Sequence, residues 1–281
     1  MTVYAAQSPL ARPRRLLAEL WVESLHSLVL ARLLLRLQLI QTYRHSSLGL
    51  LWAVVPTLVI TLGVSLSMRV ATDGPGLQAG WQAPMQVHVA FGVVLMQTFV
   101  EAFNAQRSVF NVHLSLLQRM KFPVEAVCMA QVAETAFHFL AKLPVLLVVL
   151  WLFDMPLSLR LLPGVLACLP VLLAGMVLGA LVAPLSTLGK DLDKAMAFVP
   201  WVLFLATPVF YRTPVAGPWA SVQQFNPLAA MLDVVRYVAY GDGHPAWLTF
   251  WVSLLLLALC TPLAVLVCKL APPHLAERLS A

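Results

Sequence analysis

The sequence predicts an all-α integral membrane protein with about six transmembrane helices. Sixty per cent of its 281 residues are hydrophobic, only 11% are charged, and the mean hydropathy is +0.85. This composition lies outside the range of soluble globular domains. A helix needs about 20 apolar residues to cross a hydrocarbon layer of ~30 Å, and several apolar runs of that length occur. We therefore expect one transmembrane domain over residues 1–281.

The N-terminal segment is amphipathic instead of uniformly apolar. Residues 16–40 contain Glu19, Glu23, Arg32 and Arg36, and each Arg at the centre of a span costs about 2.5–3.5 kcal/mol. Arginines one helical turn apart can reach the headgroups while neighbouring leucines sink toward the acyl chains. We expect residues 1–45 to form a cytoplasmic tail and a helix that lies in the membrane interface.

A six-span bundle is expected over residues 46–270. The fifth run differs from the others, because a helix of its length rises only about 24 Å and because Pro200 and Pro208 interrupt it. Broken helices in a membrane are tolerated only against protein or water. The connection that follows, residues 211–245, has room for one or two short re-entrant or surface helices. The predicted spans are 48–68, 86–106, 126–150, 162–185, 195–210 and 246–270.

The basic residues favour a topology with both termini in the cytoplasm. When the N-terminus is placed inside, thirteen of the 18 Lys and Arg residues fall in inside segments and four fall outside, as positive residues do in membrane proteins. Residues 271–281 are then a cytoplasmic tail. Topology also explains the net charge of +6, because no basic run with interleaved aromatics indicates a nucleic-acid partner.

A polar and basic segment, SVFNVHLSLLQRMKFP, lies between the second and third predicted spans at residues 108–123. Leu114 and Leu117 are spaced to share one face of a short helix. Such a helix could dock on a cytoplasmic partner. A loop whose charge only sets the topology explains the segment equally well.

Ionisable residues recur on one face of the third predicted span. Glu134, His138 and Lys142 are four residues apart and share a helix face, and Glu101 lies in the second span. These groups must face protein or a water-filled cavity, because they are costly in lipid. The spacing allows a proton relay, but we favour an ion pair that stabilises the bundle or a dimer interface.

Aromatic residues gather around the fifth run and the connection after it. They are typical of interfacial anchors and are also compatible with a surface on which sugar rings stack. The group comprises Phe198, Trp201, Phe204, Phe210, Tyr211, Trp219 and Phe225.

Motifs of nucleotide-binding and hydrolytic enzymes are absent. The sequence has no GxxxxGK[ST] phosphate loop, no HExxH and no GxSxG, and its four cysteines form no CxxC pair. We therefore expect a chain that is not an enzyme, cannot hydrolyse ATP alone, and binds no metal or cofactor.

Four short motifs resemble the permease subunits of ABC exporters for polysaccharides and polyol phosphates, which move O-antigen, capsule or teichoic-acid chains. The segment YRHSSLGLLW at residues 43–52 is similar to that family's YR-x-S-x-LG-x-LW signature. KFP at 121–123, KDL at 190–192 and NPL at 226–228 follow in the family's order. Together the motifs cover residues 32 to about 241.

The resemblance implies a homodimer around a central channel in the bacterial inner membrane, with two separate ABC ATPase subunits that bind ATP and Mg²⁺. The basic segment would be a coupling helix in a groove of the ATPase, and the fifth run with the stretch to residue 240 would form the outer gate. The residues assigned to ATPase coupling are Asn111, His113, Leu114, Leu117, Gln118, Arg119 and Lys121. Those of the interface helix are Arg32, Arg36, Tyr43 and Arg44, and those of the channel and gate are Trp201, Phe204, Phe210, Tyr211 and Trp219.

The predicted function is export of a lipid-linked polysaccharide, of O-antigen or capsular type, from the cytoplasm across the inner membrane during lipopolysaccharide biosynthesis. An ABC permease for a drug or other small hydrophobic molecule is the alternative within the same fold. A proton-coupled secondary transporter that uses Glu134, His138 and Lys142 is a third hypothesis, which we disfavour because no inverted repeat is visible.

Overall fold

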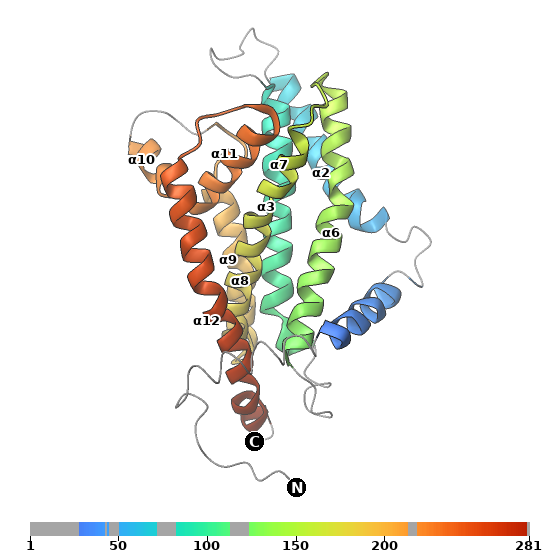
Figure 1. Ribbon diagram of the computed structural model, residues 1–281, viewed down its shortest axis with the longest axis vertical. Helices are drawn as coiled ribbons and strands as arrows, with labels where there is room; N and C mark the ends of the chain where they lie inside the picture. The colour runs from blue at the N-terminus through green and yellow to red at the C-terminus, as the bar shows by residue number, and fades with distance from the viewer. Residues whose placement is uncertain are drawn as a thin grey trace.

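The computed structural model describes residues 28–42, 44, 51–71, 83–112, 124–212 and 218–279. All regular structure in these ranges is helical, with no strand, which confirms the predicted all-α class. The long helices run side by side along the long axis of the molecule (Figure 1). Within the described ranges, four segments are long and apolar enough to span a membrane: Met85–Arg107, Ala126–Leu152, Leu161–Ser186 and Trp247–Leu270.

These four segments coincide with the second, third, fourth and sixth predicted spans. The first predicted span corresponds to α2 (Leu51–Ala71), whose apolar part is Val54–Val64. The fifth corresponds to α9 (Lys190–Ala206), which has 17 residues. The described part of the chain therefore contains four helical segments of spanning length. The predicted six spans include α2 and α9 in addition.

The limits of α9 differ from the predicted 195–210. The helix begins at Lys190, after Gly189 in an extended conformation, because Asp191 and Asp193 in its first turn interact favourably with the helix dipole. It ends at Ala206, where Thr207 turns extended ahead of Pro208. Pro208 therefore follows the helix and does not interrupt it.

The fourth predicted span consists of two helices, α7 (Leu161–Ala167) and α8 (Leu169–Ser186), which meet at Cys168. Pro170 in the first turn of α8 has no N–H and cannot continue the hydrogen-bond ladder of α7. The Cys168 thiol donates to the carbonyl of Gly164 at 3.2 Å, which satisfies one of the freed acceptors.

At the centre of the bundle lies α3 (Met85–Arg107), which is buried along nearly all of its length. Its closest neighbour is α8, and two glycines on one face of α8 permit this approach. A β-carbon at Gly179 would lie 2.3 Å from the carbonyl oxygen of Phe103, and one at Gly175 would lie 2.6 Å from that of Phe99. The backbones of α3 and α8 are thus in direct contact.

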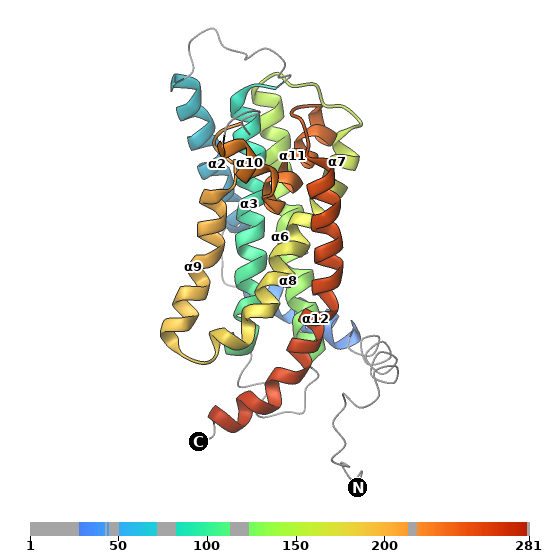
Figure 2. The ribbon, with the colours of Figure 1, turned by 90° about the vertical axis from the view of Figure 1, so that its left-hand side faces the viewer.

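Two long helices and two short ones complete the bundle (Figure 2). α6 (Val124–Leu152) and α12 (Trp247–Leu279) flank α3 and α8. α10 (Pro218–Gln224) and α11 (Pro227–Tyr240) occupy the connection in which short helices were predicted. The Asn226 side chain caps α11 by accepting from the N–H groups of Leu228 and Ala229, and Gly241 ends it with φ 79°.

The two ends of the bundle differ in what they contain. One end of the bundle, which we call the inner end, is the end predicted to be cytoplasmic. Here α3, α8 and α12 end, and α6 and α9 begin. At this end, α4 (Val109–Val112) follows α3. The opposite, outer end holds α7, α10 and α11 (Figures 1 and 2).

The predicted interface helix corresponds, in its described part, to a helix over residues 28–42 that lies obliquely beside the inner end of α6 (Figure 1). Ala31 is buried, and Leu34 packs against an apolar cluster that includes Val109, Phe110 and Val127. Arg32 and Arg36 are exposed. Arg44 lies in a turn and donates its N–H to the carbonyl of Ile40, whereas Tyr43 is outside the described residues.

Replacing Gly179 tests the contact between α3 and α8. We expect Gly179→Val to lower the melting temperature of the detergent-purified protein strongly or to prevent its purification, because overpacking a tight contact costs about 1–3 kcal/mol or more. Gly63→Val in α2 is the matched control, since a β-carbon there meets nothing within 4 Å. Equal thermal stability of the two variants would contradict the contact.

Candidate functional site

Polar side chains tie four helices together at the inner end, and we call Asn104, Arg107, Asn111, Ser186 and Asp193 the inner cluster. Arg107 is 8% exposed and is ion-paired with the carboxylate of Asp193. Its guanidinium also donates to the backbone carbonyl of Asp193 at 3.1 Å and to Asn104 Oδ1 at 3.2 Å. The end of α3 is therefore fixed to the first turn of α9.

Asn111 joins the same cluster from α4. Its Nδ2 atom donates to Asp193 Oδ1 and to the carbonyl oxygen of Ser186, both at 3.4 Å. Asn111 is the one residue of the predicted ATPase-coupling set within the described ranges. His113, Leu114, Leu117, Gln118, Arg119 and Lys121 lie outside them. The described end of the basic segment is thus hydrogen-bonded to α9.

A second set of polar groups lies at the outer end, and we call His88, Asp233, Arg236 and Asp242 the outer cluster. Arg236 is only 1% exposed and donates to the carbonyl oxygens of Pro208 and His88, each at 3.2 Å, and to Asp233 Oδ1 at 3.2 Å. A β-carbon at position 92 would lie 2.6 Å from its Nη2 atom, so Gly92 leaves room for the guanidinium. The cluster holds the exit of α9 between α3 and α11.

Histidine and tyrosine extend the outer cluster. His88 Nε2 lies 3.2 Å from the carbonyl oxygen of Tyr211, and its Nδ1 lies 3.8 Å from Asp242 Oδ2. Burial raises the pKa of the Tyr240 phenol, which therefore stays protonated beside these charges. Its ring packs edge-on against Phe91 at 5.0 Å between centroids.

Three of the predicted gate aromatics form a row along α9 and its exit. The ring centroids of Trp201 and Phe204 are 6.0 Å apart, and those of Phe204 and Phe210 are 5.7 Å apart. Trp201 is 48% exposed, whereas Phe204 is buried. Tyr211 is held differently, because its phenol oxygen accepts from Gln223 Nε2 at 3.1 Å. Trp219 lies in α10.

The intramembrane ionisable residues lie between α3 and α6. Lys142 is 1% exposed and is ion-paired with Glu101, so the pair joins the second and third predicted spans. Glu134 and His138 line a cavity of about 310 Å³ beside it. The other residues of this polar cavity are Glu101, Asn104, Ala105, Gln131 and Thr135. The predicted stripe therefore faces protein and a polar cavity, as its cost in lipid requires.

Sequence comparison identifies the protein class. A protein-family model described as ABC-2 type transporter matches residues 29–240. The chain belongs to the ABC-2 type transporter family. Members of this family are the membrane channel subunits of ABC transporters and are not themselves ATPases. The match extends from the helix over residues 28–42 to the end of α11, so both polar clusters and the polar cavity lie within the ABC-2 permease, except for Asp242.

Two relatives from Klebsiella pneumoniae carry the name O-antigen export system permease protein RfbA. They are 24% and 22% identical to this chain over 200 residues, which is 68% of the chain and 72% of each relative. The resemblance to exporter permeases that the sequence motifs indicate is thus confirmed.

Several residues that organise the ABC-2 permease were not singled out from the sequence: Arg107, Asp193, Arg236, His88 and Asp242. The KDL motif includes Lys190 and Asp191, which are exposed. It does not include Asp193, the residue that pairs with Arg107. The pair of Asp233 and Arg236 in the mostly apolar stretch of α11 was the available signal for Arg236, because charges in such a stretch must be paired or hydrogen-bonded.

A double-mutant cycle tests the ion pair between α3 and α6. We expect Glu101→Gln to destabilise the permease by about 1–3 kcal/mol, because it leaves the buried ammonium of Lys142 without its counter-ion; the loss is below that of a fully buried pair, since the Glu101 side chain is 46% exposed. The double variant Glu101→Gln with Lys142→Met should regain most of this loss. Thermal unfolding in detergent measures both. Lys142→Met alone completes the cycle, and a loss of stability in the double variant equal to the sum of the two single losses would show that the pair is not coupled.

Proposed function

We propose that this ABC-2 permease exports a lipid-linked polysaccharide, of the O-antigen or capsular type, from the cytoplasm across the bacterial inner membrane. The Klebsiella pneumoniae relatives, which are named as O-antigen export permeases, support the substrate class. The exposed aromatic face of α9 supports it further, because the C–H faces of sugar rings pack on aromatic side chains.

In this proposal two copies of the chain enclose the channel. On α9, Phe198, Trp201, Val202 and Leu205 are all exposed in the single chain, although the helix is short and charged at its start. Such a helix is not suited to face lipid along its whole length. A second copy facing it would give both helices a protein or aqueous neighbour, with the termini of both copies in the cytoplasm.

Two ABC ATPase subunits, which bind ATP and Mg²⁺, would supply the energy. The observation that carries the coupling mechanism is the inner cluster, in which Asn111 and Arg107 converge on Asp193. A displacement of the basic segment by the ATPase would reach the first turn of α9 through these hydrogen bonds. The other end of α9 is held at Pro208 by Arg236, so the displacement would change the position of α9 along the channel.

The two alternative functions are ranked by the same observations. Membership in the ABC-2 family favours ATP-driven transport over the proton-coupled hypothesis built on Glu134, His138 and Lys142. An ABC permease for a drug or small hydrophobic molecule shares the fold and the coupling mechanism. In a drug permease the aromatic row would contact a small hydrophobic molecule instead of a sugar. A substitution in this row therefore distinguishes the two functions.

Neutralising Asp193 tests the coupling mechanism. We expect Asp193→Ala to reduce export by about tenfold, since a hydrogen bond to a charged group contributes roughly 1.5–3 kcal/mol, while ATP hydrolysis by the complex continues. Asp193→Asn, which keeps an acceptor, should fall between this variant and the wild type. Cell-surface glycan on blots and phosphate release from the reconstituted complex are the measurements.

Asp191 provides the control, because it lies in the same first turn of α9 but is exposed. Asp191→Ala should export normally. An equal loss of export in both alanine variants would contradict the role of the inner cluster. It would indicate that export depends on the interaction of both carboxylates with the dipole of α9.

Removing the Trp201 ring tests the substrate. We expect Trp201→Ala to reduce glycan export severalfold and Trp201→Phe to retain most of it, because the smaller variant lacks a ring face for the sugar. Trp151→Ala is the control, since Trp151 is exposed on α6 and away from α9. Normal glycan export by Trp201→Ala, together with loss of resistance to a hydrophobic drug, would favour the drug permease.

A further inference from the structure

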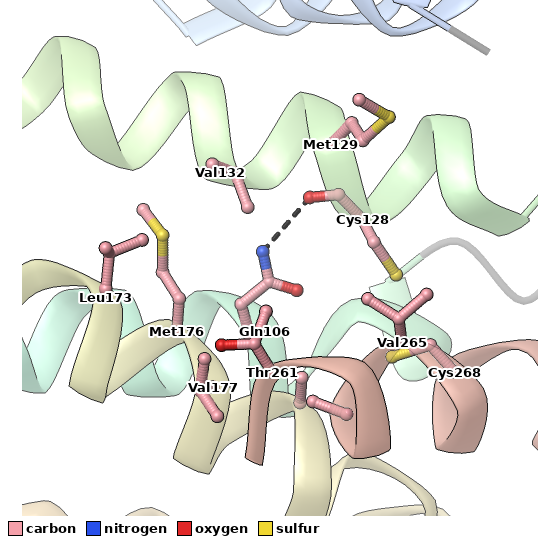
Figure 3. Close-up of a pocket in the computed structure, with 12 residues that line it drawn as sticks. Gln106, Cys128, Met129, Val132, Leu173, Met176, Val177, Thr261, Val265 and Cys268 are labelled. Carbon is pink, nitrogen blue, oxygen red and sulfur yellow. Dashed lines mark hydrogen bonds between the residues drawn. The ribbon is translucent and has the colours of Figure 1, made fainter. Parts of the chain in front are cut away.

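An apolar pocket of about 260 Å³ lies between α3, α6, α8 and α12 near the inner end (Figure 3). Its walls include Val132 from α6, Met176 and Val177 from α8, and Val265 from α12. None of its lining residues belongs to the inner cluster, the polar cavity or the aromatic row of α9. The pocket is therefore separate from every site used in the proposed transport mechanism.

One polar side chain, Gln106, points into this pocket. Gln106 is 2% exposed, and its Nε2 atom donates to the carbonyl oxygen of Cys128 at 3.0 Å. This bond fixes the orientation of the amide, because a flipped amide would place two acceptors against each other. Its Oε1 atom then faces the space between the helices and has no hydrogen-bond partner among the described residues (Figure 3).

An unpaired buried acceptor is destabilising, so an occupant that donates a hydrogen bond is favoured here. Thr261 also lines the pocket, but its hydroxyl donates to the carbonyl of Leu257. The rest of the walls are mostly apolar and rich in sulfur, with Cys128, Met129, Met176 and Cys268 among them. Methionine side chains adapt their shape to flexible apolar ligands. The occupant must therefore combine a hydrocarbon body with one hydroxyl or N–H group.

The pocket opens toward the lipid. Val132 on α6 and Val265 on α12 are exposed, as are Leu140 and Leu259 farther along the same two helices. These apolar faces contact acyl chains when the helices span a bilayer. Gln106 is the next-to-last residue of its span, so it lies close to the level at which acyl chains meet their polar groups.

We propose that this pocket binds the hydrocarbon chain of a bilayer lipid, with a hydroxyl near the polar end of that chain donating to Gln106 Oε1. The chain enters between α6 and α12 and packs against α8. The site is a lipid-binding site of the permease in addition to its transport path, and it does not depend on the identity of the exported substrate.

Photo-crosslinking tests the site in the wild-type protein. The permease is reconstituted in phosphatidylethanolamine vesicles that contain a trace of lysophosphatidylethanolamine with a diazirine on its acyl chain and a free glycerol hydroxyl beside that chain, and adducts are mapped by mass spectrometry. Adducts on the pocket residues Cys128, Met129, Met176 or Cys268 are expected. Adducts confined to exposed residues of α12 such as Leu255 and Leu259 would overturn the proposal.

Competition tests the hydrogen bond. We expect 1-dodecanol to displace the probe from the pocket at about one tenth of the concentration needed for 1-methoxydodecane, because the ether cannot donate to a buried acceptor. Gln106→Leu should remove this difference. Equal competition by the alcohol and the ether in the wild type would overturn the assigned role of Gln106.

A pair of neighbouring substitutions on α12 controls for the position of the pocket. Ala264 lines the pocket and is buried, whereas Leu263 is exposed on the same helix. Ala264→Trp should abolish the pocket adducts because it fills the space, and Leu263→Trp should retain them. Retained pocket adducts in folded Ala264→Trp would overturn the proposal; if that variant does not fold, the competition in the wild type decides.

Discussion

The direct backbone contact between α3 and α8 is the constraint on which the rest of the structure depends. It requires glycine at positions 175 and 179, because the carbonyl oxygens of Phe99 and Phe103 occupy the places of their β-carbons. The contact buries α3 in the centre of the bundle. From there α3 contributes side chains to both polar clusters, to the polar cavity and to the apolar pocket, among them His88, Glu101, Gln106 and Arg107.

Buried charges in this permease are stabilised in two different ways. Arg236 is surrounded by backbone carbonyls and one carboxylate, so its several N–H groups find acceptors from separate segments of the chain. Lys142 has one carboxylate partner on the neighbouring helix. The arginine therefore fixes the geometry of several segments at once, whereas the lysine joins two helices.

The sequence was sufficient to predict the fold class and the spans that are formed by long apolar runs. The prediction that Glu134, His138 and Lys142 face protein or water followed from the cost of an ionisable group in lipid; in the structure Lys142 is buried, and Glu134 and His138 line the polar cavity. Partners themselves were not predictable. Asp193 lies 86 residues from Arg107, and the carbonyl of His88 lies 148 residues from Arg236, and no local pattern reports such pairs. The start of α9 was predicted too late, because hydropathy alone excluded its charged first turn from the predicted span.

The glycine contact also determines which helices can move. A helix whose backbone touches its neighbour without intervening side chains cannot slide along it by a fraction of a turn, because every intermediate register brings a side chain against a carbonyl. α3 and α8 thus behave as one rigid body. α9 is attached to this body by side chains at its start and by the carbonyl of Pro208 beyond its end. In the proposed mechanism, α3 and α8 are therefore the fixed pair of helices against which α9 is displaced.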